Sequence, residues 1–225
     1  MASYEPINRR TQDLDFLVRG ISNTSDVLYN VIHEIISIPM DDGFAFSQLE
    51  VAPLPHPHMK YTGIRARMSA TFGKGQFRVS VDLGYGDIVD PELGLLPLTG
   101  GSKGALFESA IEINCYPREF IFAEKLEAVV RYGDDNSRMK DFHDLHVLIG
   151  SEHLSIKRLN LILHRVFAHR ATPLKLPINL TEEGLVALER SWKAHLRGLP
   201  VTNSMPESLK EVVADINDWL GNAIA

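Results

Sequence analysis

The pattern of apolar and polar positions divides the chain into a first part of short alternating runs and a second part of helical repeats. Alternation predicts strands, whereas apolar residues spaced three and four apart predict amphipathic helices. Strands are predicted at residues 11–19, 44–53, 62–72, 76–83 and 107–115, with one early helix at 24–38. The connection 84–105 is rich in glycine and proline and is predicted to be irregular. Later helices are predicted at 117–132, 139–149, 155–169, 181–196 and 206–221.

This order of elements predicts an α+β fold, in which a small mixed or antiparallel sheet forms one layer and a helical C-terminal domain follows it. A chain of 225 residues is long enough to bury a core in one large domain or two small ones. We expect the sheet-containing part to span residues 1–115 and the helical part to span residues 116–225.

The amino-acid composition indicates the class of protein and its compartment but no particular function. The chain is 44% hydrophobic and 23% charged, which is ordinary for a soluble globular protein. It has no apolar run of the length that a membrane helix needs, and its first residues are too polar for a signal peptide. The single cysteine, Cys115, excludes an internal disulfide framework and fits a reducing compartment. We therefore expect a cytoplasmic protein with no membrane partner.

Three carboxylates carry the clearest chemical signal. Alternation places Asp13 and Asp15 on one face of the first strand, roughly 7 Å apart along it. Asp82 lies on the polar face of the strand at 76–83. If these two strands pair, the three carboxylates converge and repel one another unless a cation binds between them. Oxygen ligands of high charge suit Mg²⁺ or Mn²⁺, and two such ions suit phosphoryl or nucleotidyl transfer.

Positive charge is concentrated beside this predicted acidic patch. The net charge of −6 argues against a generally basic nucleic-acid binder. Between Val51 and Val81, however, the chain has no acidic residue and five basic ones: Lys60, Arg65, Arg67, Lys74 and Arg78. Two interpretations stay open, either a solvated sheet that is rich in arginine by chance or a strip that faces phosphate or RNA.

A second group of charged residues lies in the predicted helices at 117–132 and 139–149. Lys125 belongs to the first, and Asp141 and Asp144 lie three apart on the second, where both can reach one helix face. Spacing alone favours ordinary helix capping and intrahelical ion pairs for these residues. A zinc site at the histidine pair His143 and His146 is disfavoured, because no third ligand lies nearby in sequence.

The order of these segments resembles the AbiEii/AbiGii toxin family of nucleotidyltransferase-like proteins. The resemblance rests on the segments Arg10-Thr11-Gln12-Asp13-Leu14-Asp15-Phe16, Val81-Asp82-Leu83-Gly84, Glu124-Lys125-Leu126 and Arg138-Met139-Lys140-Asp141-Phe142-His143-Asp144-Leu145. It implies a DNA polymerase β-like nucleotidyltransferase fold. It also implies that Asp13, Asp15 and Asp82 bind the metals and that Lys125 and Asp141 complete the site. We expect nucleotide contacts from Arg10, Thr11, Lys125 and Lys140.

The resemblance implies a Mg²⁺-dependent enzyme that takes a nucleoside triphosphate as its substrate and an RNA, such as tRNA, or a protein as its acceptor. It implies a role as the toxin of a type IV toxin–antitoxin or abortive-infection system, with a cognate antitoxin as partner. Family members carry a glycine element before the first motif, whereas Met1–Arg9 contain no glycine. We expect one of three explanations: the chain is truncated, its start is misassigned, or it has lost part of the nucleotide site. A catalytically silent binding module and a Mg²⁺-dependent phosphohydrolase remain as alternatives.

Overall fold

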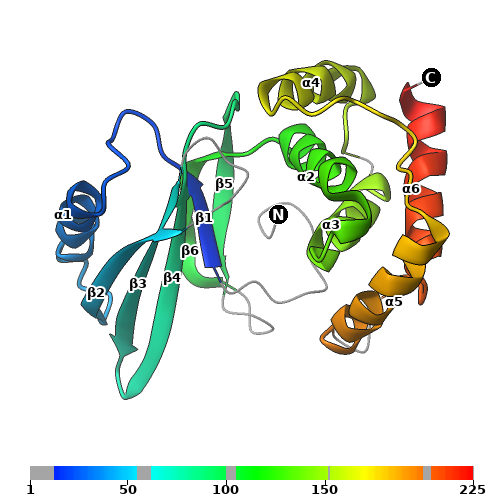
Figure 1. The fold of residues 1–225 in the computed structure, drawn as a ribbon. Coiled ribbons are helices and arrows are strands. Elements are labelled where there is room, and N and C mark those ends of the chain that lie inside the picture. Colours follow the sequence, from blue (N-terminus) through cyan, green and yellow to red (C-terminus); the bar gives the residue numbers. More distant parts are fainter. Residues whose placement is uncertain (1–12, 55–61, 100–104, 152, 200–203, 225) are drawn as a thin grey trace. The chain divides into compact units, whose positions relative to one another are not determined.

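The computed structural model describes residues 13–54, 62–99, 105–151, 153–199 and 204–224 (Figure 1). In these ranges the chain forms two compact units, which are described separately. The first spans Thr11–Asp87, and the second contains Ile88–Ala225. Within the described ranges, no helix has both the length and the apolar character needed to cross a membrane.

The first unit is a four-stranded sheet with one helix. Its strands follow the order β1-β4-β3-β2, with β1 parallel to β4 and the other neighbours antiparallel. The elements are β1 (Asp13–Leu17), α1 (Ser25–Ile36), β2 (Phe44–Leu54), β3 (Gly63–Phe72) and β4 (Gly75–Gly84). The tight β3–β4 hairpin is possible because Gly73 takes a positive φ of 57°, which costs a glycine little.

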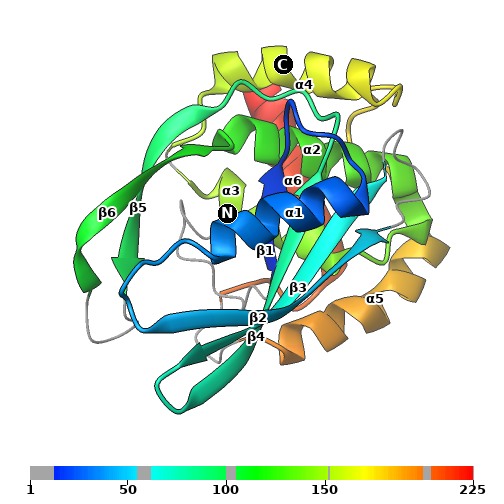
Figure 2. The same cartoon turned by 90° about the vertical axis from the view of Figure 1, so that its left-hand side faces the viewer.

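Helix α1 covers part of the apolar face of this sheet, as Figure 2 shows. Leu28 of the helix is 2% exposed and belongs to one cluster with Ile64 of β3 and Leu83 of β4. Burial of such side chains provides most of the free energy that holds a helix on a sheet. Because strand side chains alternate between faces, the polar residues of β1, β3 and β4 lie on the opposite face.

The second unit combines a two-stranded antiparallel ribbon with five α-helices in its described residues. The ribbon consists of β5 (Glu92–Thr99) and β6 (Ala105–Cys115). The helices are α2 (Arg118–Tyr132), α3 (Met139–Ile149), α4 (Ile156–His169), α5 (Glu182–Arg197) and α6 (Leu209–Ile224), with a short 3₁₀ turn at Gly133–Asp135. Fully buried side chains from several helices form the core, among them Phe122, Leu126, Phe142, Leu163 and Trp192. Thr181 caps α5, because its hydroxyl accepts a hydrogen bond from the Gly184 amide.

The predicted α+β class is confirmed, and each helix expected from the sequence is present with ends shifted by a few residues. The prediction of an irregular connection at 84–105 is wrong for Glu92–Thr99, which forms β5. Pro97 is tolerated there because a two-stranded ribbon has an unpaired outer edge that needs no N–H donor. Gly94 avoids a close contact, since a Cβ atom at this position would lie 2.9 Å from the Cys115 sulfur and would force a shift.

The expected division of the chain at residue 115 stays a prediction. Compactness separates the chain after Asp87 instead, because the β5–β6 ribbon groups with the helices.

Candidate active site

The register between β1 and β4 brings the acidic residues of the first unit together. Asp15 is the direct partner of Asp82, and Asp13 is the partner of Ser80. Paired residues of neighbouring strands lie on the same face, about 4.8 Å apart between strand axes. The three carboxylates therefore share the polar face of the sheet, as expected if the two strands pair. Their catalytic and metal-binding roles remain predictions.

Arg65 of β3 lies among these carboxylates. Its Nε donates to Asp82 Oδ1 at 2.6 Å, and its Nη2 donates to Asp82 Oδ2 at 2.5 Å. The same Nη2 lies 3.8 Å from Asp13 Oδ2. One guanidinium nitrogen thus contacts both carboxylates, so their Oδ2 atoms can be no farther apart than the sum of these two distances.

The electrostatics of this cluster favour a charged Arg65. Its hydrogen bond to Asp82 is the largest influence and raises the pKa of Arg65, burial opposes it, and the charges of Asp82, Asp13 and Asp15 raise it further. The side chains of Arg65, Asp82 and Asp13 are 25%, 17% and 38% exposed. The cluster is therefore open enough for a ligand to reach and closed enough for charge pairing to matter.

The sequence had placed Arg65 only in a basic strip, and its pairing with Asp82 was missed. In the structure the turn is Gly73-Lys74, because Phe72 pairs with Gly75, and this turn fixes the register of the two strands that it joins. That register makes Arg65 the partner of Asp82, Arg67 the partner of Ser80 and Ser69 the partner of Arg78.

The donor set of this cluster suits a hard divalent cation in its chemistry, because each ligand would be a carboxylate oxygen. The arrangement itself is not that of a formed metal site: in the described residues, no three histidine, cysteine or acidic side chains are placed to hold an ion. The reason is visible at Asp82, where Arg65 engages both oxygens. The carboxylates fit Mg²⁺ or Mn²⁺ only if Arg65 moves away from Asp82.

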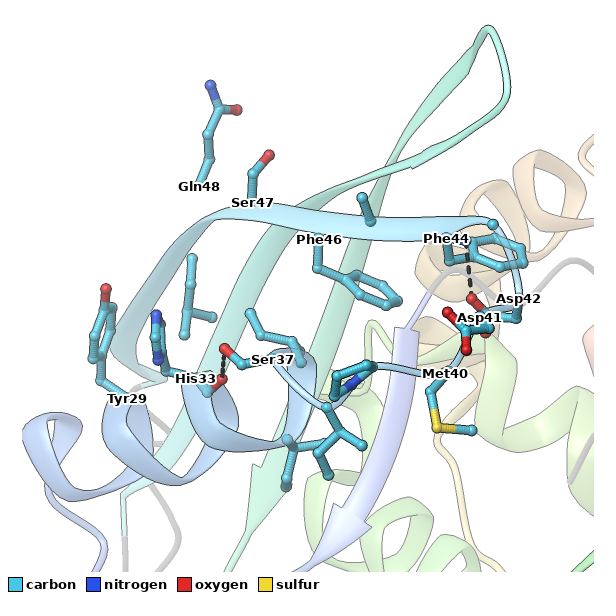
Figure 3. Close-up of a pocket in the computed structure, with 17 residues that line it drawn as sticks. Tyr29, His33, Ser37, Met40, Asp41, Asp42, Phe44, Phe46, Ser47 and Gln48 are labelled. Atoms are coloured by element: carbon cyan, nitrogen blue, oxygen red, sulfur yellow. Dashed lines mark hydrogen bonds between the residues drawn. The ribbon is translucent and has the colours of Figure 1, made fainter.

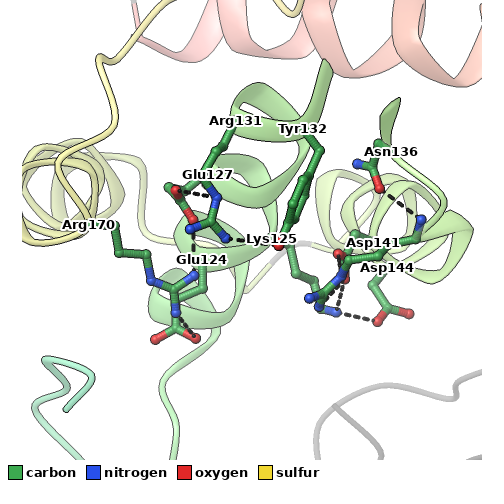
Figure 4. A network of polar contacts seen from close by, with 10 residues as sticks. Glu124, Lys125, Glu127, Arg131, Tyr132, Asn136, Asp141, Asp144 and Arg170 are labelled. Carbon is green, nitrogen blue, oxygen red and sulfur yellow. Dashed lines mark hydrogen bonds and ion pairs between the residues drawn. The ribbon is translucent and has the colours of Figure 1, made fainter. Parts of the chain in front are cut away.

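The second unit holds Lys125 between two buried carboxylates (Figure 4). Its Nζ lies 3.0 Å from Asp141 Oδ1 and 2.8 Å from Asp144 Oδ2, and these aspartate side chains are 2% and 0% exposed. Burial lowers the pKa of Lys125, but the negative charges of Asp141 and Asp144 outweigh it and raise that pKa above its ordinary value. Arg138 also binds Asp141, with 2.6 Å between Nε and Oδ2. Lys125 is thus a charged, oriented ammonium.

A neighbouring network on α2 serves to connect elements of the second unit. Glu127 is fully buried and accepts hydrogen bonds from Arg170 Nη1 at 3.0 Å and from Thr172 Oγ1 at 2.5 Å. Arg131 of the same helix lies 3.3 Å from it, and Arg170 also pairs with Glu124 (Figure 4). These contacts tie α2 to the segment that follows α4.

Among the described residues, the other predicted site residues do not belong to the cluster of Asp13, Asp15 and Asp82 in the first unit. Lys140 is exposed on α3, next to the buried Asp141. Arg10 and Thr11 lie outside the described residues. Lys125 and Asp141 belong to the second compact unit, whereas the three carboxylates belong to the first. The helical spacing of Asp144 indicated an ion pair within its own helix, and its ion pair with Lys125 was not predicted.

A hollow of about 830 Å³ lies elsewhere in the first unit, between the end of α1 and the start of β2 (Figure 3). Phe44 and Phe46 line it, together with His33, Met40 and the Asp41-Asp42 turn. The register pairs Phe44 with Phe72 and Phe46 with Ala70, which places these rings on the apolar face of the sheet. The hollow is therefore separate from the carboxylate face.

Two solved structures from Helicobacter pylori are similar to this chain. No curated protein matches the chain. Among solved structures, JHP933 from Helicobacter pylori is similar, with 16% identity, coverage of 99% of this chain and 78% of that one, and a TM-score of 0.49. A proposed nucleotidyltransferase from H. pylori is similar with 15% identity, coverage of 98% and 80%, and a TM-score of 0.46.

The family comparison covers nearly the whole chain. A sequence model described as "Nucleotidyl transferase AbiEii toxin, Type IV TA system" matches residues 1–215. This chain therefore belongs to the AbiEii family of nucleotidyl transferase toxins.

Proposed function

We propose that this protein transfers a nucleotide from a nucleoside triphosphate to an acceptor hydroxyl, with Asp13, Asp15 and Asp82 at the reacting centre. The observation that carries the proposal is the β1–β4 register, which pairs Asp15 with Asp82. In the reaction, the acceptor oxygen attacks the α-phosphorus. The bond from that phosphorus to the bridging oxygen of the β-phosphate breaks, and pyrophosphate leaves.

Asp13, Asp15 and Asp82 would hold Mg²⁺ or Mn²⁺. When bound, such ions would lower the pKa of the acceptor hydroxyl and neutralise charge on the phosphates. Asp82 would accept the proton that the hydroxyl loses, after Arg65 has released at least one of its oxygens. The geometry thus supports separate roles, with the more exposed Asp13 and Asp15 as ligands and Asp82 as ligand and base.

Lys125 would bind an oxygen of the triphosphate as a fixed positive charge. An ammonium has three N–H donors, and Asp141 and Asp144 lie at hydrogen-bonding distance from the Lys125 nitrogen. The third donor can serve a phosphate, while the two aspartates hold the side chain in place. Asp141 would therefore act by orienting Lys125. Lys140, Arg10 and Thr11 would add further nucleotide contacts.

The acceptor that we propose is RNA, with tRNA as the first candidate. Arg67 and Arg78 lie on the same face of the sheet as the three carboxylates, as their register partners show. A polyanion that approaches the acidic cluster needs such cations beside it. The family membership supports a toxin role in the cytoplasm, restrained by a cognate antitoxin.

The proposal is tested with nucleoside triphosphates labelled at the α- or the γ-phosphate, incubated with Mg²⁺, total RNA and lysate protein. Transfer predicts that the α-label becomes covalently attached to an acceptor and that the γ-label appears in pyrophosphate. Release of inorganic phosphate without a labelled acceptor would show a phosphohydrolase instead. No product from either label, together with no joint binding of metal and nucleotide, would show a silent binding module.

A further inference from the structure

Arg65 has a contact that the proposed reaction must break. Its guanidinium engages both oxygens of Asp82 and approaches Asp13, and these are the oxygens that a divalent cation would need. We infer that Arg65 is an internal counter-cation of the carboxylate cluster, which holds the metal site closed until metal and nucleotide arrive together. This inference rests on the proposed function, because it concerns the regulation of the same site.

Competition between Arg65 and a metal follows from charge and geometry. A bidentate guanidinium uses the lone pairs of both carboxylate oxygens that face it. A divalent cation placed among the same oxygens would be repelled by the guanidinium and would find those lone pairs occupied. An arginine side chain stays protonated in proteins, so the conflict can be relieved only when the side chain moves.

The position of Arg65 makes such a movement feasible. It lies on the surface of the sheet with a quarter of its side chain exposed, and a long side chain at a surface can change rotamer without disturbing the core. A triphosphate offers the released guanidinium a new anionic partner that metal alone does not offer. Metal and nucleotide should therefore bind cooperatively, and metal by itself should bind weakly.

Arg67 provides a matched control. It lies two residues further along β3, on the same face and with the same charge, but its partner on β4 is Ser80. Its side chain is more exposed than that of Arg65. Any general effect of removing a positive charge from this face should appear in Arg67→Gln as well, whereas release of Asp82 should appear only in Arg65→Gln.

The test measures Mn²⁺ binding without nucleotide, by electron paramagnetic resonance of the free ion, for the wild type, Arg65→Gln and Arg67→Gln. We expect Arg65→Gln to bind Mn²⁺ at least about fivefold more tightly than the wild type and Arg67→Gln to bind it unchanged or slightly more tightly. A second readout is thermal unfolding: Mn²⁺ should raise the melting temperature of Arg65→Gln more than that of the wild type, since tighter binding to the native state stabilises it more.

If Arg65→Gln does not fold, Arg65→Lys replaces it in the Mn²⁺ measurement. A lysine keeps the positive charge but cannot donate two parallel hydrogen bonds to both carboxylate oxygens of Asp82. It should bind Mn²⁺ more tightly than the wild type. Equal or weaker Mn²⁺ binding by the folded variants would overturn the inference and leave the proposed function standing, provided that the wild type binds Mn²⁺ together with nucleotide. If neither the wild type nor the variants bind Mn²⁺ with or without nucleotide, the inference and the proposed metal site both fail.

Discussion

Asp15 and Asp82 occupy directly paired positions on two neighbouring parallel strands, β1 and β4. The strands are far apart in sequence, yet the pairing places both carboxylates on one face and at one level of the sheet. Two like charges at this separation destabilise the sheet unless a cation offsets them. Arg65 supplies that charge in the structure described here.

Asp15→Asn should abolish nucleotidyl transfer without unfolding the protein. Asp15 is exposed, so the neutral isostere should change the free energy of unfolding by no more than about 0.5 kcal/mol. Loss of a metal ligand should lower activity by about a hundredfold or more, because even groups that only support ligands contribute 10–100-fold. The two quantities are measured by initial rates and by urea unfolding.

Asp26→Asn is the matched control for this prediction, since Asp26 is an exposed aspartate in the same unit, on α1. It should leave the rate unchanged. A sharp loss of stability in Asp15→Asn with a proportionate loss of activity would indicate a structural role for Asp15.

Lys125→Ala should lower both nucleotide affinity and stability. Stability should fall because the substitution leaves Asp141 and Asp144 as two buried carboxylates without the ammonium that now lies between them. Removing one partner of a buried ion pair costs about 3–5 kcal/mol. Nucleotide affinity, measured by calorimetry at low temperature, should fall about tenfold or more, equivalent to about 1.4 kcal/mol.

Lys125→Arg separates the two effects, because it keeps the charge that Asp141 and Asp144 need. It should recover most of the stability while the changed geometry still weakens nucleotide binding. Normal nucleotide affinity in a folded Lys125→Ala protein would remove Lys125 from the proposed site.

Stability should depend on pH through Lys125 on the alkaline side. The folded-state pKa of Lys125 is raised above the ordinary value of 10.5. Its contribution is therefore complete below about pH 10.5, the unfolded-state value, and is lost as pH rises through the folded-state pKa. Lys125→Arg should reduce this loss, because arginine keeps its proton. Equal alkaline loss in the two proteins, measured by urea unfolding between about pH 9 and 12, would contradict the assignment.

Glu127→Gln should destabilise the second unit while transfer at permissive temperature is unchanged. The carboxylate is fully buried and binds Arg170 and Thr172, so a neutral amide leaves a buried cation poorly paired. We expect a loss of about 1–3 kcal/mol in the free energy of unfolding. Glu207→Gln, at an exposed position, should be silent in the same urea titration. A stable Glu127→Gln protein with reduced transfer would instead place Glu127 in the chemistry.

Local patterns were sufficient for most of the fold. The alternation of residues 62–72 and 76–83 predicted β3 and β4, and it placed Asp82 on the polar face, because strand periodicity is a local property. The strand β5 was not predicted, since Gly94 and Pro97 are breakers in isolation and are accepted only beside β6. That acceptance depends on a non-local pairing.

The acidic residues of the candidate site could be predicted from the sequence, whereas the partners of its basic residues could not. Asp13 and Asp15 are marked by their spacing alone. Arg65 becomes a partner of Asp82 only through the hairpin register, and Asp144 joins Asp141 around Lys125 only when α2 packs on α3. Long basic side chains can reach many acids, so the sequence does not specify which acid each one binds.

A crystal structure with Mn²⁺ and a non-hydrolysable nucleoside triphosphate, with the metal located by its anomalous scattering, tests the proposed metal site most directly. We predict an anomalous peak about 2.0–2.5 Å from carboxylate oxygens of Asp13 and Asp15. We also predict that Arg65 has released at least one oxygen of Asp82. Nucleotide bound elsewhere, with no peak at these carboxylates and with Arg65 still bidentate on Asp82, would contradict the proposed metal site.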